Sequence, residues 1–223
     1  MNYQLRDRLR SFLFLHAFIE LIDAGQFATL SFRIKFPLSI RKFLQMTLRN
    51  YPLSRVYQLL EPGPVVLLTT ASKSRANVMA MSWHMMVEFE PPLVACVVSE
   101  ANFSFRALRS TGDAVIAIPS RRLADKVVKV GNCSGREIDK FRHFGLTPLP
   151  SRRITPPLIG ECFCNLECRV KDTSLVKRYN LFILEVVKAW IDLSQKNPKT
   201  LHHRGYGSFV VDGASIKLRS RMR

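Results

Sequence analysis

The chain has 223 residues, of which 47% are hydrophobic, and it carries 34 Lys and Arg against 17 Asp and Glu. This length and apolar content predict one domain with a sizeable core, and they exclude disorder for the bulk of the chain. The formal net charge of +17 favours nucleic acids, membrane surfaces or small anionic ligands as partners, and it indicates nothing about the fold.

The five cysteines are an odd number and too few for a disulfide scaffold of this length. They indicate reduced, mostly buried thiols, and we therefore expect a cytoplasmic protein. The longest apolar stretch, residues 11–32, is interrupted by His16, Glu20, Asp23 and Gln26. Because a spanning helix requires about 18 or more apolar residues, we expect no transmembrane segment.

The first 45 residues differ in character from the rest, and we expect residues 1–45 to be a basic N-terminal extension outside the fold. Apolar residues at mixed spacings between Leu13 and Ile22 fit a helix with a wide apolar face, which Gly25 would end. Three interpretations remain. The segment is a basic amphipathic helix on a membrane or on the domain, a poor secretory signal, or an extension from an upstream start, since Met46 opens the next segment cleanly.

From residue 51 onwards, short apolar and β-branched runs are separated by turn residues, beginning with Pro62-Gly63-Pro64. Most of these runs follow one another without long helices between them, so a largely antiparallel sheet is expected. The polar segment 71–76 is expected to break the first run. The expected strands are 65–70, 78–88, 93–98, 113–118, 161–170, 181–191 and a pair turned around Gly213, 208–211 with 215–218.

Two short helices are expected between the strands. One covers 103–109, with Asn102 as its N-cap, and the other covers 121–130, before a stop at Gly131. At the C-terminal end, basic residues alternate from Lys217 to Arg223 as they would on a solvated edge strand.

None of the common nucleotide, hydrolase or metalloprotease motifs is present: the sequence has no G-x-G-x-x-G, P-loop, G-x-S-x-G or H-E-x-x-H. A strand would point Cys162, Cys164 and Cys168 to one face, but this spacing lacks a fourth ligand. We therefore predict buried thiols there and no metal site. Cys96, in an apolar run, is predicted to lie in the core.

Three further segments could carry chemistry. The strand that starts at Asn77 has four methionines and a tryptophan interleaved with polar residues, which fits either a soft ligand face or a Met-rich core strand. The segment 99–104 fits either a phosphate seat at a helix N-terminus or an ordinary N-cap loop. His202 and His203 are expected in a loop beside Arg204, where they could meet an anionic substrate or cap a backbone carbonyl.

Seven segments, in this order, resemble the flavin reductase-like family, whose members have the FMN-binding split barrel. They are YPLSRVYQLLEPGPVVLLTT, NVMAMSWHMM, EPPLVACVVSEANFS, VGNCSGREIDKF, PLIGECFCNLECRV, FILEVVKAW and LHHRGYGSFVVDG. The last four are similar to the flavoredoxin branch in particular. The resemblance covers about residues 50–223. It implies a domain over 46–223 that is mainly β: an antiparallel, Greek-key-like split barrel with two or three short helices.

The resemblance also implies a homodimer that binds FMN non-covalently near the dimer interface. Such a protein is an NAD(P)H-dependent flavin oxidoreductase or a flavoredoxin-like electron-transfer protein, with NADH or NADPH as donor and a partner protein among the candidate acceptors. His202 and His203 match the loop that meets nicotinamide or flavin, and they are the candidate catalytic residues. The implied cofactor-binding residues are Thr69, Thr70, Asn77, Val78, Met79, Ala80, Ser82, Ser99, Asn102, Ser104, Lys140 and Phe141.

Two other functions stay open from the sequence. One is an FMN carrier or sensor without catalytic turnover. The other is a basic nucleic-acid-binding protein, which is disfavoured because the basic residues are scattered and are not interleaved with aromatic stacking platforms.

Overall fold

The computed structural model describes residues 48–72 and 75–219. The predicted extension over 1–45, its helix and the start at Met46 lie outside the described residues, so they stay predictions. The chain order of the described elements is β1 (Leu48–Tyr51), η1 (Leu53–Arg55), α3 (Tyr57–Leu60), β2 (Val66–Ser72), β3 (Arg75–Met81), β4 (His84–Phe89), β5 (Pro92–Val97), α4 (Phe103–Thr111), β6 (Asp113–Ile118), η2 (Arg121–Leu123), α5 (Ala124–Gly131), α6 (Lys140–His143), β7 (Pro148–Leu149), β8 (Leu158–Ile159), β9 (Cys164–Asp172), α7 (Val176–Tyr179), β10 (Leu181–Asp192), β11 (Leu201–Gly205) and β12 (Ser208–Val211).

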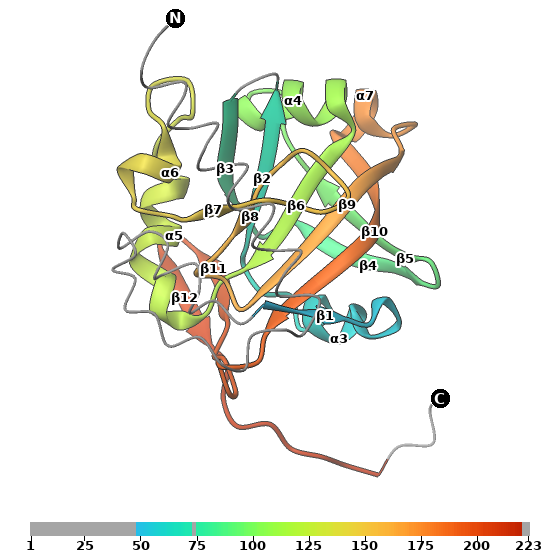
Figure 1. Cartoon of the computed structure of the whole chain (residues 1–223), viewed down its shortest axis with the longest axis vertical. Helices are drawn as coiled ribbons and strands as arrows, with labels where there is room; N and C mark the ends of the chain where they lie inside the picture. The colour runs from blue at the N-terminus through green and yellow to red at the C-terminus, as the bar shows by residue number, and fades with distance from the viewer. Residues whose placement is uncertain (1–47, 73–74, 220–223) are drawn as a thin grey trace, which may run out of the picture. The chain divides into compact units, whose positions relative to one another are not determined.

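One large antiparallel sheet dominates these elements. Its strands follow the order β3-β2-β6-β9-β10-β5-β4, and β1 adds to β10. The strands β11 and β12 form a separate hairpin, as do the short strands β7 and β8. Helix α4 packs on β2, and helix α5 packs on β3 (Figure 1). The predicted mainly β, antiparallel fold class is confirmed.

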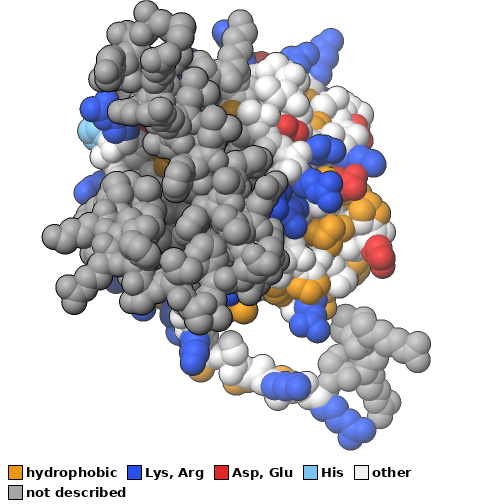
Figure 2. All heavy atoms as spheres, in the orientation of Figure 1, with side chains coloured by type: hydrophobic (Ala, Val, Ile, Leu, Met, Phe, Trp, Pro, Cys, Tyr) orange, Lys and Arg blue, Asp and Glu red, His pale blue; other side chains and the backbone are white. Residues whose placement is uncertain are grey.

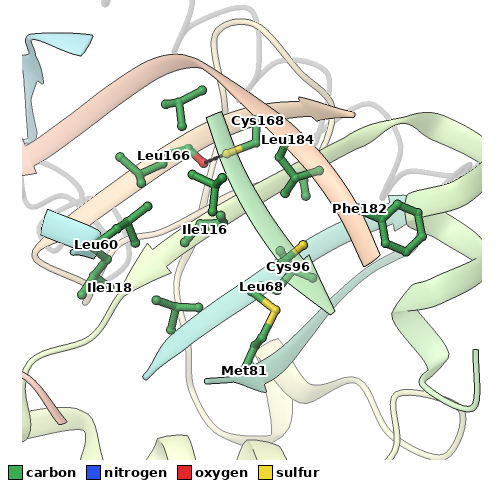
Figure 3. Packing of buried hydrophobic residues seen from close by; sticks show 14 of the residues in the cluster. Leu60, Leu68, Met81, Cys96, Ile116, Ile118, Leu166, Cys168, Phe182 and Leu184 are labelled. Atoms are coloured by element: carbon green, nitrogen blue, oxygen red, sulfur yellow. Dashed lines mark hydrogen bonds between the residues drawn. The ribbon is translucent and has the colours of Figure 1, made fainter. Parts of the chain in front are cut away.

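Apolar side chains on the two faces of the sheet enter two different core clusters. In the first cluster Leu68 from β2, Ile116 from β6 and Leu184 from β10 pack together (Figure 3). In the second cluster Val78 and Val127 pack between β3 and α5. Because β2 is covered on both faces, six consecutive residues of it are buried, which explains why its sequence does not alternate between apolar and polar residues.

The predicted strand over 78–88 is wrong in one respect, since it is two strands, β3 and β4. The chain leaves the sheet at Ser82-Trp83 and returns in β4, which pairs with β5 at another place in the sheet. The predicted break over 71–76 is also too wide. Residues as far as Ser72 and from Arg75 belong to β2 and β3 and pair with each other.

The predicted pairing of 208–211 with 215–218 is wrong, because β12 pairs with β11. Three consecutive residues with positive φ, Gly205, Tyr206 and Gly207, reverse the chain between these strands. The expected loop at His202 and His203 is therefore a strand. Residues 212–219 have no regular structure, so the expected C-terminal edge strand is also wrong within the described residues.

The two predicted helices are present as α4 and as η2 followed by α5. Asn102 precedes α4 with extended backbone angles, but its side chain makes no capping hydrogen bond. Helix α4 ends at Gly112, whose φ of 72° is the left-handed conformation that favours glycine. The one-turn helices α3, α6 and α7 were not predicted.

The predicted buried thiols are confirmed at Cys96, Cys162, Cys164 and Cys168, and none of the described cysteines forms a disulfide. Burial raises the pKa of the Cys96 thiol to about 12, and it raises the pKa values of the other three thiols as well. The expectation that three of these thiols share one face is wrong. Cys162 precedes β9 and packs in the second cluster, whereas Cys164 and Cys168 pack in the first.

Candidate functional site

Three adjoining hollows form a trough along β3. The apolar hollow is lined by Val65, Ala80, Met81, Ser82, Val127, Val128, Gly131, Asn132, His203, Gly207 and Phe209. The central hollow is lined by Asn77, Met79, Ala80, Ala101, Asn102, Phe103, Ser104, Val130, Gly131, Asn132, Cys133, Ser134, Gly135, Glu137 and Lys140. The basic hollow is lined by Thr70, Ser72, Arg75, Asn77, Asn102, Phe103, Arg106, Ala107, Ser110 and Arg136.

Shared residues join the hollows in a row. Ala80, Gly131 and Asn132 line both the apolar and the central hollow. The central and the basic hollow have Asn77, Asn102 and Phe103 in common. The central and basic hollows enclose about 430 Å³ and 390 Å³, within the range of small-molecule sites. The trough therefore changes from apolar to polar to basic along its length.

Strand β3 runs along the trough as the first strand of the sheet order. Within the described residues it pairs with β2 alone, so its outer backbone N–H and C=O groups form no sheet hydrogen bonds. These groups can meet a ligand with a polar edge. Four of the predicted site residues on this strand or directly after it line the trough: Asn77, Met79, Ala80 and Ser82. The fifth, Val78, is buried in the second core cluster and lines none of the three hollows.

The two predicted threonines of β2 differ in surroundings. Thr69 is fully buried and donates its hydroxyl to the carbonyl of Pro157 over 2.7 Å. Thr70 is also fully buried and lines the basic hollow, but its Oγ1 has no hydrogen-bond partner. A buried hydroxyl without a partner is costly, and a ligand in the basic hollow would satisfy it.

Helix α4 brings its first turn to the trough. Ser104 is buried and accepts a hydrogen bond from the Asn77 side chain, with 2.9 Å between Nδ2 and Oγ. Asn102 is exposed and lines both the central and the basic hollow. The predicted Ser99 lines none of the three hollows, and its hydroxyl accepts from the backbone N–H of Ala101. The free N–H groups at this helix N-terminus suit an anion.

Lys140 begins α6 and lines the central hollow from a buried position. Its Nζ donates to the carbonyl of Val130 over 2.8 Å, and it forms no ion pair with any described carboxylate. Burial lowers the pKa of this ammonium, while the neighbouring Cys133 thiol raises it. The predicted Phe141 is buried in the second core cluster and lines none of the three hollows.

The loop between α5 and α6 closes the central hollow, and the sequence reasoning gave its residues no role. Gly135 packs so closely that a Cβ there would lie 2.6 Å from Asn77 Cγ and 2.7 Å from Phe103 Cδ1. Arg75 holds this loop against β3, because its guanidinium donates to the carbonyls of Gly135 and Ile138. In the sequence, the glycines and the serine of the GNCSGR segment were the feature that could have indicated a close approach of this loop to its neighbours.

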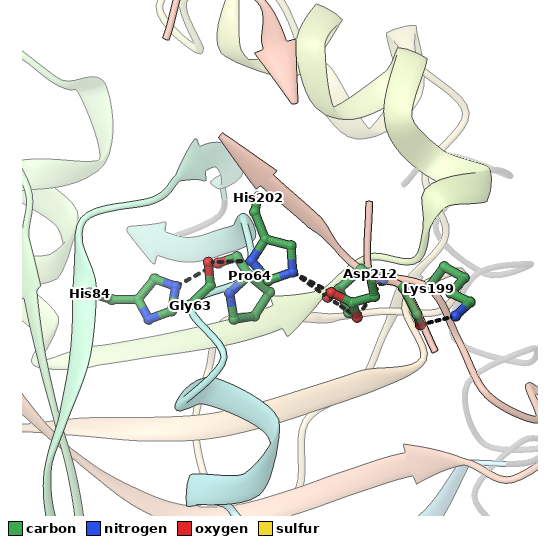
Figure 4. Close-up of polar contacts among 8 residues, drawn as sticks. Gly63, Pro64, His84, Lys199, His202 and Asp212 are labelled. Atoms are coloured by element: carbon green, nitrogen blue, oxygen red, sulfur yellow. Dashed lines mark hydrogen bonds and ion pairs between the residues drawn. The ribbon is translucent and has the colours of Figure 1, made fainter. Parts of the chain in front are cut away.

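The two predicted histidines face different surroundings. His203 lines the apolar hollow, and its ring centroid lies 5.1 Å from that of Phe209. His202 lies within hydrogen-bond distance of the Gly63 carbonyl, the Thr200 hydroxyl and the Asp212 carboxylate (Figure 4). Burial raises the pKa of the Asp212 carboxyl, but hydrogen bonds from the Thr200 hydroxyl and backbone N–H, together with His202, outweigh this effect and hold the pKa below its usual value. The structure thus places His203 at the trough, whereas His202 ties the hairpin to the turn before β2.

The chain belongs to the flavin reductase-like family, since the family model of the flavin reductase like domain matches residues 59–209. The Escherichia coli K12 protein YddH is 35% identical over 173 residues, which cover 71% of this chain and 92% of YddH. Its name assigns it no function. The resemblance that the sequence motifs indicated is therefore confirmed.

Solved structures support the same family. The FMN-binding domain of a flavin reductases-like enzyme from Shewanella baltica has a TM-score of 0.73 and 26% identity, over 78% of this chain and 98% of that one. Flavoredoxin of Desulfovibrio vulgaris (Miyazaki F) has a TM-score of 0.63 and 25% identity, over 70% and 90%. The fold is that of the FMN-binding flavin reductase-like barrels. None of the helices within 48–72 and 75–219 has the length and apolar character that crossing a membrane requires.

Proposed function

We propose that the protein binds FMN in the trough and acts as a flavin oxidoreductase, with NADH or NADPH as electron donor and a separate acceptor, such as a partner protein. The order of chemistry along the trough carries this proposal. The apolar hollow suits the ring of FMN, and the adjoining central hollow, which is lined by hydroxyl and amide groups and by the buried ammonium of Lys140, suits its ribityl chain and phosphate. The free, buried thiols support the expected cytoplasmic location.

The residues present fit this cofactor. The outer backbone edge of β3 can pair with the polar edge of a flavin, while Met81, Val127 and Phe209 offer apolar surface to its plane. Ser104, the first turn of α4 and the buried ammonium of Lys140 surround the central hollow, where a phosphate carrying about two negative charges would be neutralised.

FMN, when bound, supplies the hydride-transfer chemistry that the protein's side chains lack. The chain's own residues bind the cofactor and the donor, orient them towards each other and exclude water. Phe209 and His203 form the wall of the apolar hollow on the side of the β11–β12 hairpin, and Val127 and Val128 form the wall on the side of α5. No acid–base pair is needed for this role, because the geometry between donor and ring determines the rate.

We further propose that two copies associate through the apolar stripe of β4, which consists of Trp83, directly before the strand, and of Met85, Val87 and Phe89 on it. Their exposed fractions are 72%, 63%, 47% and 57%, and they occupy every second position of a segment whose strand ends the sheet order. A contiguous exposed apolar stripe on an edge strand marks an interaction surface. A second copy is the occupant that the family resemblance implies. Because Trp83 follows Ser82 of the apolar hollow, the interface would border the site.

The test is the visible absorption spectrum of the purified protein, before and after anaerobic addition of NADH or NADPH. The proposal predicts flavin bands that bleach within seconds with at least one nucleotide. Flavin bands that persist with both nucleotides would instead support an FMN carrier or sensor. A colourless protein that does not take up added FMN would contradict cofactor binding altogether.

A further inference from the structure

The basic hollow contains more positive charge than the phosphate of FMN requires. Three arginines line it, Arg75, Arg106 and Arg136, and none of the other residues that line it is acidic. Arg75 is already engaged, because its guanidinium donates to two backbone carbonyls and lies 5.3 Å from the centroid of the Phe103 ring. Arg106 and Arg136 are exposed, and their guanidiniums have no hydrogen bond or ion pair with a described residue.

The second observation is the unpartnered hydroxyl at the same place. Thr70 is fully buried, lines the basic hollow and lacks a hydrogen-bond partner at Oγ1. The central hollow has its own groups for the FMN phosphate, namely Lys140, Ser104 and the first turn of α4. Two free guanidiniums and one free hydroxyl therefore remain at the far end of the trough, where they match the oxygens of one further phosphate.

Resting on the proposed function, we infer that Arg106, Arg136 and Thr70 bind the 2′-phosphate of NADPH, so that the protein selects NADPH over NADH. The two nucleotides differ only in that phosphate, and arginine side chains commonly recognise it. The nicotinamide has to reach the flavin ring in the apolar hollow. Since the three hollows are joined, the adenosine end of the same nucleotide can lie over the basic hollow. Arg106 lies on α4 and Arg136 follows α5, so the two arginines are far apart in the sequence and only the fold brings them to one hollow.

Binding of nucleotide fragments to the FMN-loaded protein tests this inference without any turnover. Adenosine 2′,5′-bisphosphate and 5′-AMP are titrated by calorimetry at constant ionic strength, since surface electrostatics depend on salt. We expect the bisphosphate to bind at least about tenfold more tightly, as for a charge-assisted phosphate contact. The Arg106→Gln/Arg136→Gln variant is expected to reduce this preference to below about threefold.

The matched control is Arg109→Gln/Arg122→Gln. It removes the same charge from two exposed arginines that line none of the three hollows. This control is expected to keep the preference. Equal binding of the two fragments by the wild type would overturn the inference, and so would an equal loss in the control, which would indicate only long-range net charge. A variant that loses FMN affinity but keeps the preference would also overturn it, because the arginines would then hold the FMN phosphate.

Anaerobic bleaching supplies a second readout. The ratio of the NADPH rate to the NADH rate is expected to fall about tenfold or more in Arg106→Gln/Arg136→Gln and to stay unchanged in the control. If neither nucleotide bleaches the wild-type flavin, the proposed reductase function fails. The comparison of the two fragments still decides whether the basic hollow recognises a 2′-phosphate, so the two failures are distinguishable.

Discussion

Asn77 on β3 and Ser104 on α4 are joined by a hydrogen bond of 2.9 Å between Nδ2 and Oγ, and both side chains are buried. This bond fixes the first turn of the helix against the edge strand of the sheet. Both residues line the central hollow, so the bond also sets the width of the trough. A ligand in this hollow meets a wall that is already positioned, which lowers the entropic cost of binding.

Gly135 is expected to be essential to that wall. Gly135→Ala adds a Cβ within 3.0 Å of Asn77 and Phe103, so it should displace the loop, weaken FMN binding and destabilise the protein by about 1–3 kcal/mol. Urea unfolding and flavin titration measure the two effects. Gly213→Ala is the matched control, because a Cβ there meets nothing within 4 Å. Equal stability of the two variants would contradict the close approach at Gly135.

Lys140 is expected to act on the phosphate and not on the flavin ring. Lys140→Met keeps the length of the side chain but removes its buried charge, so the affinity for FMN should fall at least about tenfold. The affinity for riboflavin, which lacks the phosphate, should stay the same. Fluorescence titration of both ligands gives the result, with the exposed Lys129→Met as control. Equal losses for FMN and riboflavin would assign Lys140 a structural role instead.

The two histidines of β11 are expected to give different phenotypes. His203→Ala opens the wall of the apolar hollow and should slow anaerobic flavin bleaching on the order of tenfold, because the donor is held less well. His202→Ala removes contacts to Gly63, Thr200 and Asp212, so it should lower the free energy of unfolding by about 1 kcal/mol. Stopped-flow spectroscopy and urea unfolding separate the two. Similar bleaching rates for both variants would argue against the assignment of His203 to the site.

His84 is expected to make stability depend on pH. Burial lowers the pKa of its imidazole below 6.5, although the hydrogen bond from Nε2 to the Pro64 carbonyl, over 2.7 Å, opposes this shift (Figure 4). The unfolded chain therefore binds a proton at a higher pH than the folded chain does. It follows that stability is lost as the pH falls from about 6.5 towards the lowered pKa. Urea unfolding between pH 7.5 and 5.5 should show this loss, and His84→Gln should reduce it. An unchanged slope in the variant would contradict the role of His84.

The apolar stripe of β4 is expected to hold the dimer. Trp83→Glu/Met85→Glu places two charges in the proposed interface and should convert the protein to a monomer, since a buried unpaired charge is costly. Light scattering after size-exclusion chromatography measures the mass. The control, Leu193→Glu, adds a charge at a residue that is 62% exposed and lies outside the stripe. A wild-type monomer, or a dimer in both variants, would contradict this interface.

From the sequence, a nucleic-acid-binding role was disfavoured because the basic residues are scattered along the chain. They are also scattered over the face of the molecule seen in Figure 2. There the visible Lys and Arg side chains lie at several separate places. The basic hollow gathers three arginines from β3, α4 and the loop after α5. A cluster of three arginines suits a small phosphorylated ligand better than a nucleic acid, which would need basic residues along an extended surface.

Local sequence patterns predicted the strands and helices whose conformation depends mainly on neighbouring residues in the chain. The β-branched run of β2 and the helix after Asn102 follow from propensity and backbone preference. The same reasoning failed for β11, because His202 and His203 are polar and follow a proline-containing turn. Their strand conformation comes from pairing with β12, which a propensity does not encode.

By itself the sequence determined the antiparallel β class, the buried thiols, the family and most residues of β3 that line the trough. The β class and the buried thiols follow from local patterns of apolar and polar residues, whereas the family and the β3 residues came from the resemblance of several motifs in order. Only the tertiary structure decided which of Thr69 and Thr70 lacks a hydrogen-bond partner, which histidine faces the trough, and that Arg106 and Arg136 line one hollow. The reason is physical: burial, hydrogen bonding and charge clustering depend on contacts between residues far apart in the chain, which exist only after the sheet has closed over its core.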